Sequence, residues 1–415
     1  MKNSAASAPK TPGVTDISQV PARASWLTRS VVAIGIASLL SDACYELVIP
    51  LLPALVVALG GGALALGAIE GFADGLAALF KLWGGVVADR TKHRRALTAT
   101  GYLGVGICMP AIGFATSVVG VFALRVGGWI CRGFRSPIRD TLLVDDTDPK
   151  FVNRAFGFTR ALDTVGAVIG PAAAMLLVAL HVPVAKAILF GFVPGVLAGA
   201  MYAFVRERPR AVPEARPLHL VLAALPRDFL RYLLGAGIFG LGNFSATLLV
   251  LVAMRAFAPQ LGPLAATTLA TGLYLGHNVV YASLAYPASL VSERIGAGKM
   301  LLLSFLAFAC VGIVVALAPT QPGAIIAAFI LAAVGVAVLD PMEATFATEL
   351  LPADRRGSGF GALAAVNGIG DLVSSLGVGA LWQVAGPAVA FGASAALCIA
   401  GAIVLAPLAL RRSSV

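Results

Sequence analysis

Residues 85–90 of the chain read Gly-Val-Val-Ala-Asp-Arg, and residues 289–294 read Ser-Leu-Val-Ser-Glu-Arg. The two stretches lie 204 residues apart, and each places an acidic residue before an arginine at the end of a long apolar run. The same offset recurs from Phe156 to Phe360, from Gly157 to Gly361 and from Gly166 to Gly370. Chance would produce one such match in a glycine-rich chain, but several at one offset indicate a duplicated sequence.

The composition is that of a membrane protein. Hydrophobic residues make up 59% of the 415 residues and charged residues only 12%, whereas soluble domains carry roughly 25% charged residues. So few charges could not cover the apolar surface of a soluble fold of this length, but in a bilayer the lipid is the solvent. The mean hydropathy of +0.91 agrees. The net charge of +10 lies in short gaps between apolar runs, so membrane topology explains it better than nucleic-acid binding does.

Twelve apolar runs are long enough to cross a bilayer, since a spanning helix needs roughly 20 mostly apolar residues. They lie near 30–58, 64–87, 96–117, 119–142, 156–180, 183–205, 229–256, 263–291, 299–318, 322–349, 359–383 and 386–409. Short turns alone separate the third run from the fourth and the ninth from the tenth, so ten or eleven crossings are the alternative count. No cleaved signal peptide is expected, because the first 27 residues lack an apolar core followed by a processing site.

Basic residues alternate between the gaps. They gather before the first run and after the even-numbered runs, as at Arg90, Arg94 and Arg95, while the odd-numbered gaps are nearly bare. The positive-inside rule therefore predicts that both termini lie in the cytoplasm and that the number of crossings is even. We expect a multi-pass protein of the cytoplasmic (inner) membrane.

The longest polar stretch, rich in proline and arginine, falls at the midpoint of the chain and predicts a linker. The resulting division is a cytoplasmic tail at 1–27, a six-helix bundle at 28–205, a cytoplasmic linker at 206–228, a second six-helix bundle at 229–410 and a tail at 411–415. The expected fold is all-α and membrane-integral, with twelve helices in two pseudo-symmetric bundles, an arrangement typical of transporters.

The loop after the second run resembles motif A of the major facilitator superfamily, and the resemblance covers essentially the whole chain. The matching residues are Gly85, Asp89, Arg90 and Arg94, with Lys92 where a second glycine is usual and His93 where a basic residue is usual. The second copy keeps Glu293, Arg294 and Gly296 but has Ser289 for the first glycine. In the family these charges link helices at the cytoplasmic face and help to hold the outward-open state, so the resemblance implies a gating role. Plain positive-inside topology is the alternative.

The fifth run is similar to motif C, which occurs mainly in the drug/proton antiporters of that superfamily. The residues that match are Gly157, Gly166, Gly170 and Pro171, while Ala174-Met175 replace the usual Gly-Gly. The resemblance implies export. Ordinary close packing of helices through small residues is the alternative.

Ionisable side chains inside membrane spans are costly and usually functional. Asp42 and Glu46 lie one turn apart on one face of the first run. A carboxylate that either pairs with arginine or takes a proton is what proton coupling requires, so we expect these two acids to couple transport to protons, with Arg125 as their partner. Arg125 also stands where the arginine of the family's motif B stands, although the glycines that follow have a different spacing. A second expected pair joins Arg132 to Asp163.

Further polar and aromatic residues within the runs are candidates for a substrate cavity. They are Tyr45, Glu70, Asp74, Trp129, Arg160, Asp163, Tyr274, His277, Asn278, Asp340 and Glu343. For the aromatic residues and His277, ordinary packing is the alternative, and for Glu70 and Asp74 it is contact with water.

These patterns favour a secondary transporter that exports a drug or metabolite against protons. The alternatives are a proton-coupled importer and a carrier of metal ions or siderophores with the same fold. No Walker sequence and no credible nucleophile motif is present, so neither an ATP-driven pump nor an enzyme is expected. The five scattered cysteines predict neither a disulfide framework nor a metal site. The expected partners are a small molecule, protons and lipid, and we expect a monomer without cofactor or nucleic acid.

Overall fold

The computed structural model describes residues 26–207, 225–352 and 355–411. Most of the predicted tails and linker therefore lies outside the described residues. The first bundle consists of α1 (Arg29–Val48), η1 (Ile49–Leu51), α2 (Leu52–Ala58), α3 (Ala63–Arg90), α4 (Arg94–Ala111), η2 (Ile112–Phe114), α5 (Val118–Asp145), η3 (Pro149–Phe151), α6 (Val152–Ala179), α7 (Val184–Leu189), α8 (Phe192–Ala200) and η4 (Met201–Phe204). The second consists of α9 (Arg227–Gly240), α10 (Ala246–Ile295), α11 (Ala297–Leu317), α12 (Pro322–Leu350) and α13 (Arg356–Arg411).

Every predicted crossing has a helical counterpart. Nine helices in the described part of the chain are long and apolar enough to span a membrane. Two of them, α10 and α13, are each two crossings joined at a bend. α5 also crosses but is too charged to be counted among the nine, and α9, only 14 residues long, completes a crossing with the first part of α10. The all-α fold with twelve crossings is confirmed.

Sharp bends divide α10 and α13, so each of these long helices contains two crossings. Gly262 in α10 and Gly386 in α13 have φ of 78° and 85°, a region that residues with a Cβ rarely enter. Each is followed by a proline, which fits the first position of a new helix. Residues with positive φ recur at matching turns of the first bundle, at Gly60 and at His181. The duplicated sequence therefore folds with the same sharp turns in both halves.

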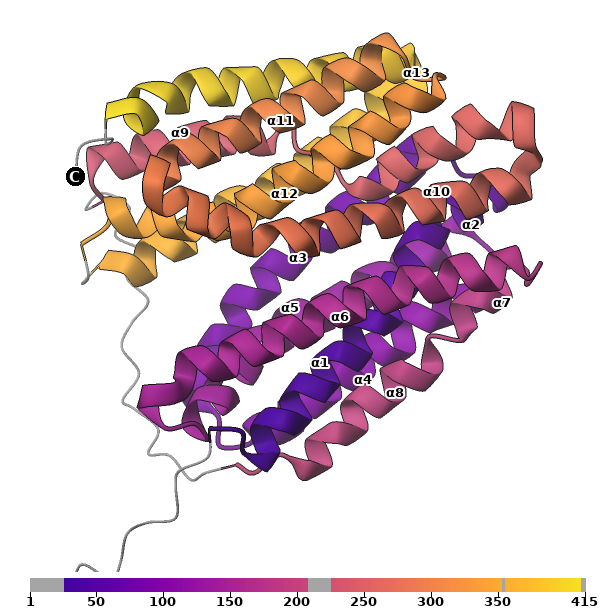
Figure 1. Cartoon of the computed structure of the whole chain (residues 1–415). Helices are drawn as coiled ribbons and strands as arrows, with labels where there is room; N and C mark the ends of the chain where they lie inside the picture. The colour runs from indigo at the N-terminus through magenta and orange to yellow at the C-terminus, as the bar shows by residue number, and fades with distance from the viewer. Residues whose placement is uncertain (1–25, 208–224, 353–354, 412–415) are drawn as a thin grey trace, which may run out of the picture.

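The two bundles lie side by side (Figure 1), and among the described residues they share a buried apolar cluster at one end and not at the other. We call the end that holds Arg90, Arg94 and the start of α9 the basic end, and the opposite one, with the sharp turns, the far end. One apolar cluster at the far end contains buried residues of both bundles, such as Leu51 and Leu249. At the basic end the buried clusters are separate, one in each bundle. The bundles thus diverge towards the basic end.

Glycines set the closest approach between the bundles, where α3 runs antiparallel to α13. A Cβ on Gly67 would clash with the carbonyl oxygen of Ser375, and one on Gly71 would lie 2.7 Å from that of Leu372. The last such contact towards the basic end joins Gly368 to Ala78, and Gly85 faces open space. Small residues therefore let α3 and α13 pack closely at the far end, whereas the two bundles are separated at the basic end.

Candidate functional site

A buried ion pair links α3 to α5 in the third turn of each helix, counted from the far end. The Nε and Nη2 atoms of Arg125 donate to the two carboxylate oxygens of Glu70 at 3.0 and 2.8 Å. Both side chains are 2% exposed. The bidentate geometry is the strong form of an arginine–carboxylate pair. The expected pairing of Arg125 with Asp42 or Glu46 is therefore wrong: α3 turns Glu70 towards α5 and supplies the partner.

Aromatic side chains surround this pair. The guanidinium carbon of Arg125 lies 3.3 Å from the centre of the Trp129 ring, and the indole N–H of Trp129 donates to Asp74 at 2.7 Å. Tyr45 meets Trp129 edge to face. The Tyr45 hydroxyl in turn accepts from Arg132 at 3.3 Å. Trp129 and Tyr45 are buried within this network, so neither presents a free ring face to the space between the bundles.

Glu46 connects α1 to the second bundle. Its Oε2 accepts hydrogen bonds from the Tyr274 hydroxyl at 2.9 Å and from the Asn278 amide at 3.1 Å. The same amide also donates to the carbonyl oxygen of Ala167 in α6. Glu70 makes a second connection of this kind, because Ser245, at the start of α10, donates to it at 3.3 Å. Two carboxylates of the first bundle thus hold the second bundle by hydrogen bonds.

The remaining charges of the first bundle run along α5 towards the basic end. Asp163 lies 3.9 Å from Arg139, so the expected pair of Asp163 with Arg132 is also wrong. Arg132 forms no ion pair in the described part of the chain. The charged neighbours of Asp42 are Asp163, Arg132 and Glu46. Arg160 is exposed, and it interacts electrostatically with Asp340 of the second bundle.

A cavity of about 440 Å³ lies between the bundles at mid-depth. Its lining is Asp74, Asn243, Phe244, Ser245, Ala246, Leu249, His277, Phe308, Val311, Phe329, Ala332, Val336, Asp340, Asp371 and Ser375. Three of these side chains are carboxylates and none is lysine or arginine. Of the residues predicted for a substrate cavity, Asp74, His277 and Asp340 line it.

The second bundle supplies acids without cations to balance them. Asp340 accepts from the Tyr281 hydroxyl at 3.0 Å, and Glu343 accepts from the Asn367 amide at 2.8 Å. Asp371 lines the cavity together with Asp340, whereas Glu343 is not among the lining residues. In the described part of the chain none of the three lies in an ion pair. This wall of the cavity therefore carries acidic side chains that no ion pair engages in the described part of the chain.

Sequence reasoning missed the cavity residues Asn243, Ser245 and Ser375. The run 229–256 reads as one continuous span, but the helix is broken between Gly240 and Ala246. The freed carbonyl oxygens of Gly242 and Asn243 accept from the hydroxyls of Ser394 and Ser374 at 2.5 and 2.7 Å. Irregular backbone at this depth is tolerated where it is buried in protein or lines a cavity. In the sequence, the feature that indicates this break is the pair of closely spaced glycines at 240 and 242, followed by Asn243.

The family motifs have distinct structural roles. A Cβ on Gly170 would lie 2.7 Å from the backbone nitrogen of Leu47, and one on Gly166 would clash with Leu39, so these glycines seat α6 against α1 beside Asp42 and Glu46. Gly157 faces open space, and Pro171 is buried inside α6. Among the motif A residues, Arg94 is buried and pairs with Asp145 at 2.9 Å.

The other charges of both motif A copies are exposed. They are Asp89, Arg90, Glu293 and Arg294. Within the described ranges none of them forms an ion pair or a side-chain hydrogen bond. In this conformation, in which the two bundles are separated at the basic end, these charged side chains do not link helices. The described residues also hold no group of three or more His, Cys, Asp and Glu side chains placed to bind a metal ion.

Comparisons with known proteins agree on the fold. The family model of the Major Facilitator Superfamily matches residues 34–274 and again 232–415. An MFS-type transporter of Methanocaldococcus jannaschii is 26% identical over 91% of this chain and 94% of its own length. The protein Rv2265 of Mycobacterium tuberculosis is 30% identical over 54% of this chain and 58% of its own length.

Solved transporters superpose over nearly the whole chain. The nucleoside transporter NupG has a TM-score of 0.73 at 12% identity and covers 92% of this chain and 99% of its own. A POT family transporter in complex with a thioalcohol-conjugated peptide has a TM-score of 0.75 at 13% identity, with coverages of 93% and 97%. At such identities the likeness extends to the fold alone.

Proposed function

The chain belongs to the major facilitator superfamily of secondary transporters, and from this premise we propose that it exports a small organic cation in exchange for protons. The observation that carries the proposal is the mid-depth cavity, which is lined by Asp74, Asp340 and Asp371 and by no lysine or arginine. Carboxylates in a site of low polarity favour a positively charged ligand. Substrate sites near the bilayer midplane, between two repeats and beside a broken helix, are typical of such transporters.

Proton coupling is supported by the two carboxylates that hold the bundles together. Glu46 and Glu70 each accept hydrogen bonds from the second bundle. A protonated carboxyl is a weaker acceptor than a carboxylate, so proton binding weakens the far-end connection. We therefore place coupling on Glu46 and, in revision of the pairing argued from the sequence, on the Glu70–Arg125 pair. Asp42 remains a third candidate because it adjoins Arg132 and Asp163.

Export is supported by the glycine spacing in α6, which resembles that of antiporters, and by the close seating of α6 on α1. We propose that the basic end, and with it both termini, faces the cytoplasm of the inner membrane. The described conformation is then open to the inside. A proton-coupled importer of the same architecture is the alternative, and the direction of flux in the experiments below decides between them.

Replacement of Asp371 by Asn is expected to weaken recognition of a cationic probe. The variant loses one of the three acidic side chains that line the cavity but keeps a side chain of the same shape. Because two unit charges about 6 Å apart attract each other by roughly 3 kcal/mol at an effective dielectric constant of about 20, the apparent affinity for tetraphenylphosphonium should fall about tenfold or more. Uptake into inverted vesicles measures it, with Asp228→Asn, an exposed acid outside the cavity, as the control. Equal loss in both variants, or no transport of any cation, would contradict the cationic substrate.

Glu46→Gln is expected to uncouple transport from protons. The amide still accepts hydrogen bonds from Tyr274 and Asn278 but cannot take up a proton. In inverted vesicles loaded with a pH-sensitive dye, the proton movement triggered by substrate should disappear while substrate binding persists. Glu293→Gln, which removes an exposed carboxyl at the basic end, serves as the control for charge. If Asp42→Asn, Glu46→Gln and Glu70→Gln all leave the proton signal intact, the coupling assignment fails.

A further inference from the structure

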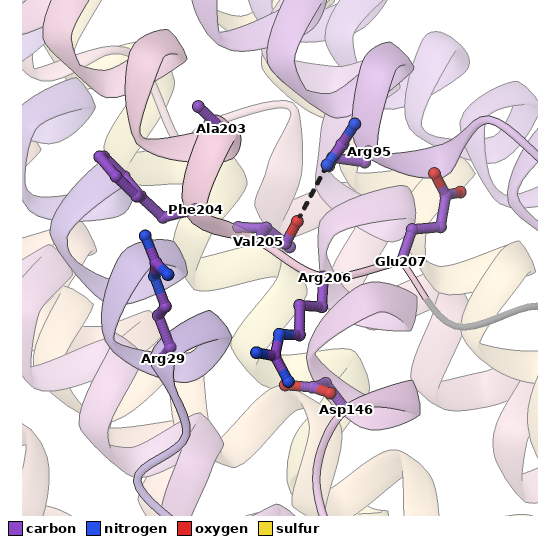
Figure 2. A pocket seen from close by; sticks show the side chains of 8 residues that line it. All are labelled: Arg29, Arg95, Asp146, Ala203, Phe204, Val205, Arg206 and Glu207. Carbon is purple, nitrogen blue, oxygen red and sulfur yellow. Dashed lines mark hydrogen bonds between the residues drawn. The ribbon is translucent and has the colours of Figure 1, made fainter.

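A second cavity, of about 590 Å³, lies at the basic end of the first bundle and away from the space between the bundles. Figure 2 shows its lining: Arg29, Arg95, Asp146, Ala203, Phe204, Val205, Arg206 and Glu207. The three arginines come from the start of α1, the start of α4 and the chain after η4. The transport mechanism proposed above uses none of them.

The guanidinium groups of this cavity have unused hydrogen-bond donors. Arg29 lies over the Phe204 ring at 5.0 Å and, like the Arg206 side chain, donates no hydrogen bond within the described ranges. Among the residues that the structure describes, Arg95 donates to the carbonyl oxygen of Val205 alone, at 3.4 Å. An arginine carries five N–H donors in a fixed fork that matches phosphate oxygens. The cavity thus offers most of its donors to a ligand.

The two acids of the cavity are already engaged. Glu207 accepts from the backbone N–H of Arg94 at 2.6 Å and so caps α4. Asp146 accepts from the Thr28 hydroxyl at 2.9 Å. Among the described lining residues, three cations against two carboxylates leave a surplus of one positive charge, which a single phosphodiester neutralises.

An apolar stripe leads from the cavity along the outer surface of the bundle. Phe204, Leu197 and Val193 follow one another at nearly helical spacing and are 44, 45 and 65% exposed. Helix α8, which carries the latter two, lies on the edge of the first bundle that faces away from the second (Figure 1). In a membrane such a face contacts acyl chains. A phosphate-binding pocket at the end of a lipid-facing stripe matches a phospholipid rather than a soluble anion.

We propose that this cavity binds the headgroup of an anionic phospholipid from the leaflet at the basic end. The guanidinium groups of Arg29, Arg95 and Arg206 hold the phosphate, and the acyl chains lie along the stripe from Phe204 to Val193. Basic pockets among membrane helices are known to recognise anionic headgroups in this way. Bound lipid would join the start of α1 to the end of the sixth crossing.

The test uses the full chain in detergent, titrated with phosphatidylglycerol or phosphatidylcholine, with bound lipid counted by native mass spectrometry. Phosphatidylglycerol should bind to wild-type protein more tightly than phosphatidylcholine. Arg29→Gln with Arg206→Gln removes two side chains that make no hydrogen bond to the described part of the chain. Each basic residue near an anionic lipid surface contributes about fivefold in affinity. The double variant should therefore bind phosphatidylglycerol roughly 30-fold more weakly than the wild type does. Arg154→Gln with Arg231→Gln is the matched control, since both are exposed arginines at the basic end.

The melting temperature without lipid reports whether the variants fold, and Arg29→Lys with Arg206→Lys should restore part of the binding. Inorganic phosphate and glycerol phosphate, used alone, separate a soluble anion from a lipid. The proposal is overturned if the two phospholipids bind equally, if the control pair loses as much affinity as the cavity pair, or if free phosphate competes as well as lipid does.

Discussion

Arg125→Gln is expected to destabilise the protein more than any other single replacement of a charged side chain. The change leaves the Glu70 carboxylate 2% exposed and without its cation. Breaking a buried pair from one side costs about 3–5 kcal/mol, because an uncompensated charge stays in a site of low polarity. The midpoint of thermal or denaturant unfolding in detergent should therefore fall sharply, and transport should be lost.

A double replacement separates stability from function. Glu70→Gln with Arg125→Gln removes both charges at once, so much of the stability should return, whereas coupling should not. Arg231→Gln is the control, because its exposed pair with Asp228 is of a class that contributes about 0–1 kcal/mol. If Arg125→Gln unfolds like the wild type, the pair does not hold α3 to α5.

Gly67→Val is expected to trap the transporter with its far end open. A Cβ at this position meets the backbone oxygen of Ser375, and backbone cannot move aside as a flexible side chain can. Overpacking costs about 1–3 kcal/mol, and here the cost falls only on the conformation with the far end closed. The equilibrium between the two conformations should shift by roughly 5- to 150-fold, and transport should slow accordingly while the fold persists.

The shift can be measured at Ser245, which lines the cavity. In a chain whose native cysteines are replaced, a cysteine at position 245 should react faster with a membrane-impermeant maleimide added from the far end when Gly67→Val is present. Gly377→Val is the control, because a Cβ at Gly377 meets nothing within 4 Å. Equal labelling and equal transport in both variants would show that the contact between α3 and α13 does not close the far end.

The sequence predicted the crossings well because a bilayer imposes a simple requirement, a run of about 20 apolar residues. It also indicated the duplication, since motif A and the Phe-Gly pair recur at one offset. It could not assign the partner of Arg125. Glu70 and Arg125 each stand seven residues from the far-end start of their helix, but which residues face each other depends on how each helix is rotated about its axis, which no single span specifies.

The cavity was only partly predictable for a related reason. Asp74, His277 and Asp340 attract notice because charges are costly in a membrane. Asn243 and Ser245 do not, because their role depends on a break in the helix, and glycines such as Gly240 and Gly242 are also common in unbroken spans.

The asymmetry between the two ends of the molecule has a thermodynamic consequence. The far end closes on a shared apolar cluster, whereas the walls that diverge towards the basic end carry Arg160 and Asp340. Exposing apolar surface to water raises the heat capacity and is least unfavourable in the cold, and ionic attraction between exposed groups weakens as salt is added. Temperature should therefore change mainly the equilibrium between the open and closed far end, and ionic strength mainly that of the basic end. The two halves of the transport cycle thus respond to different physical variables.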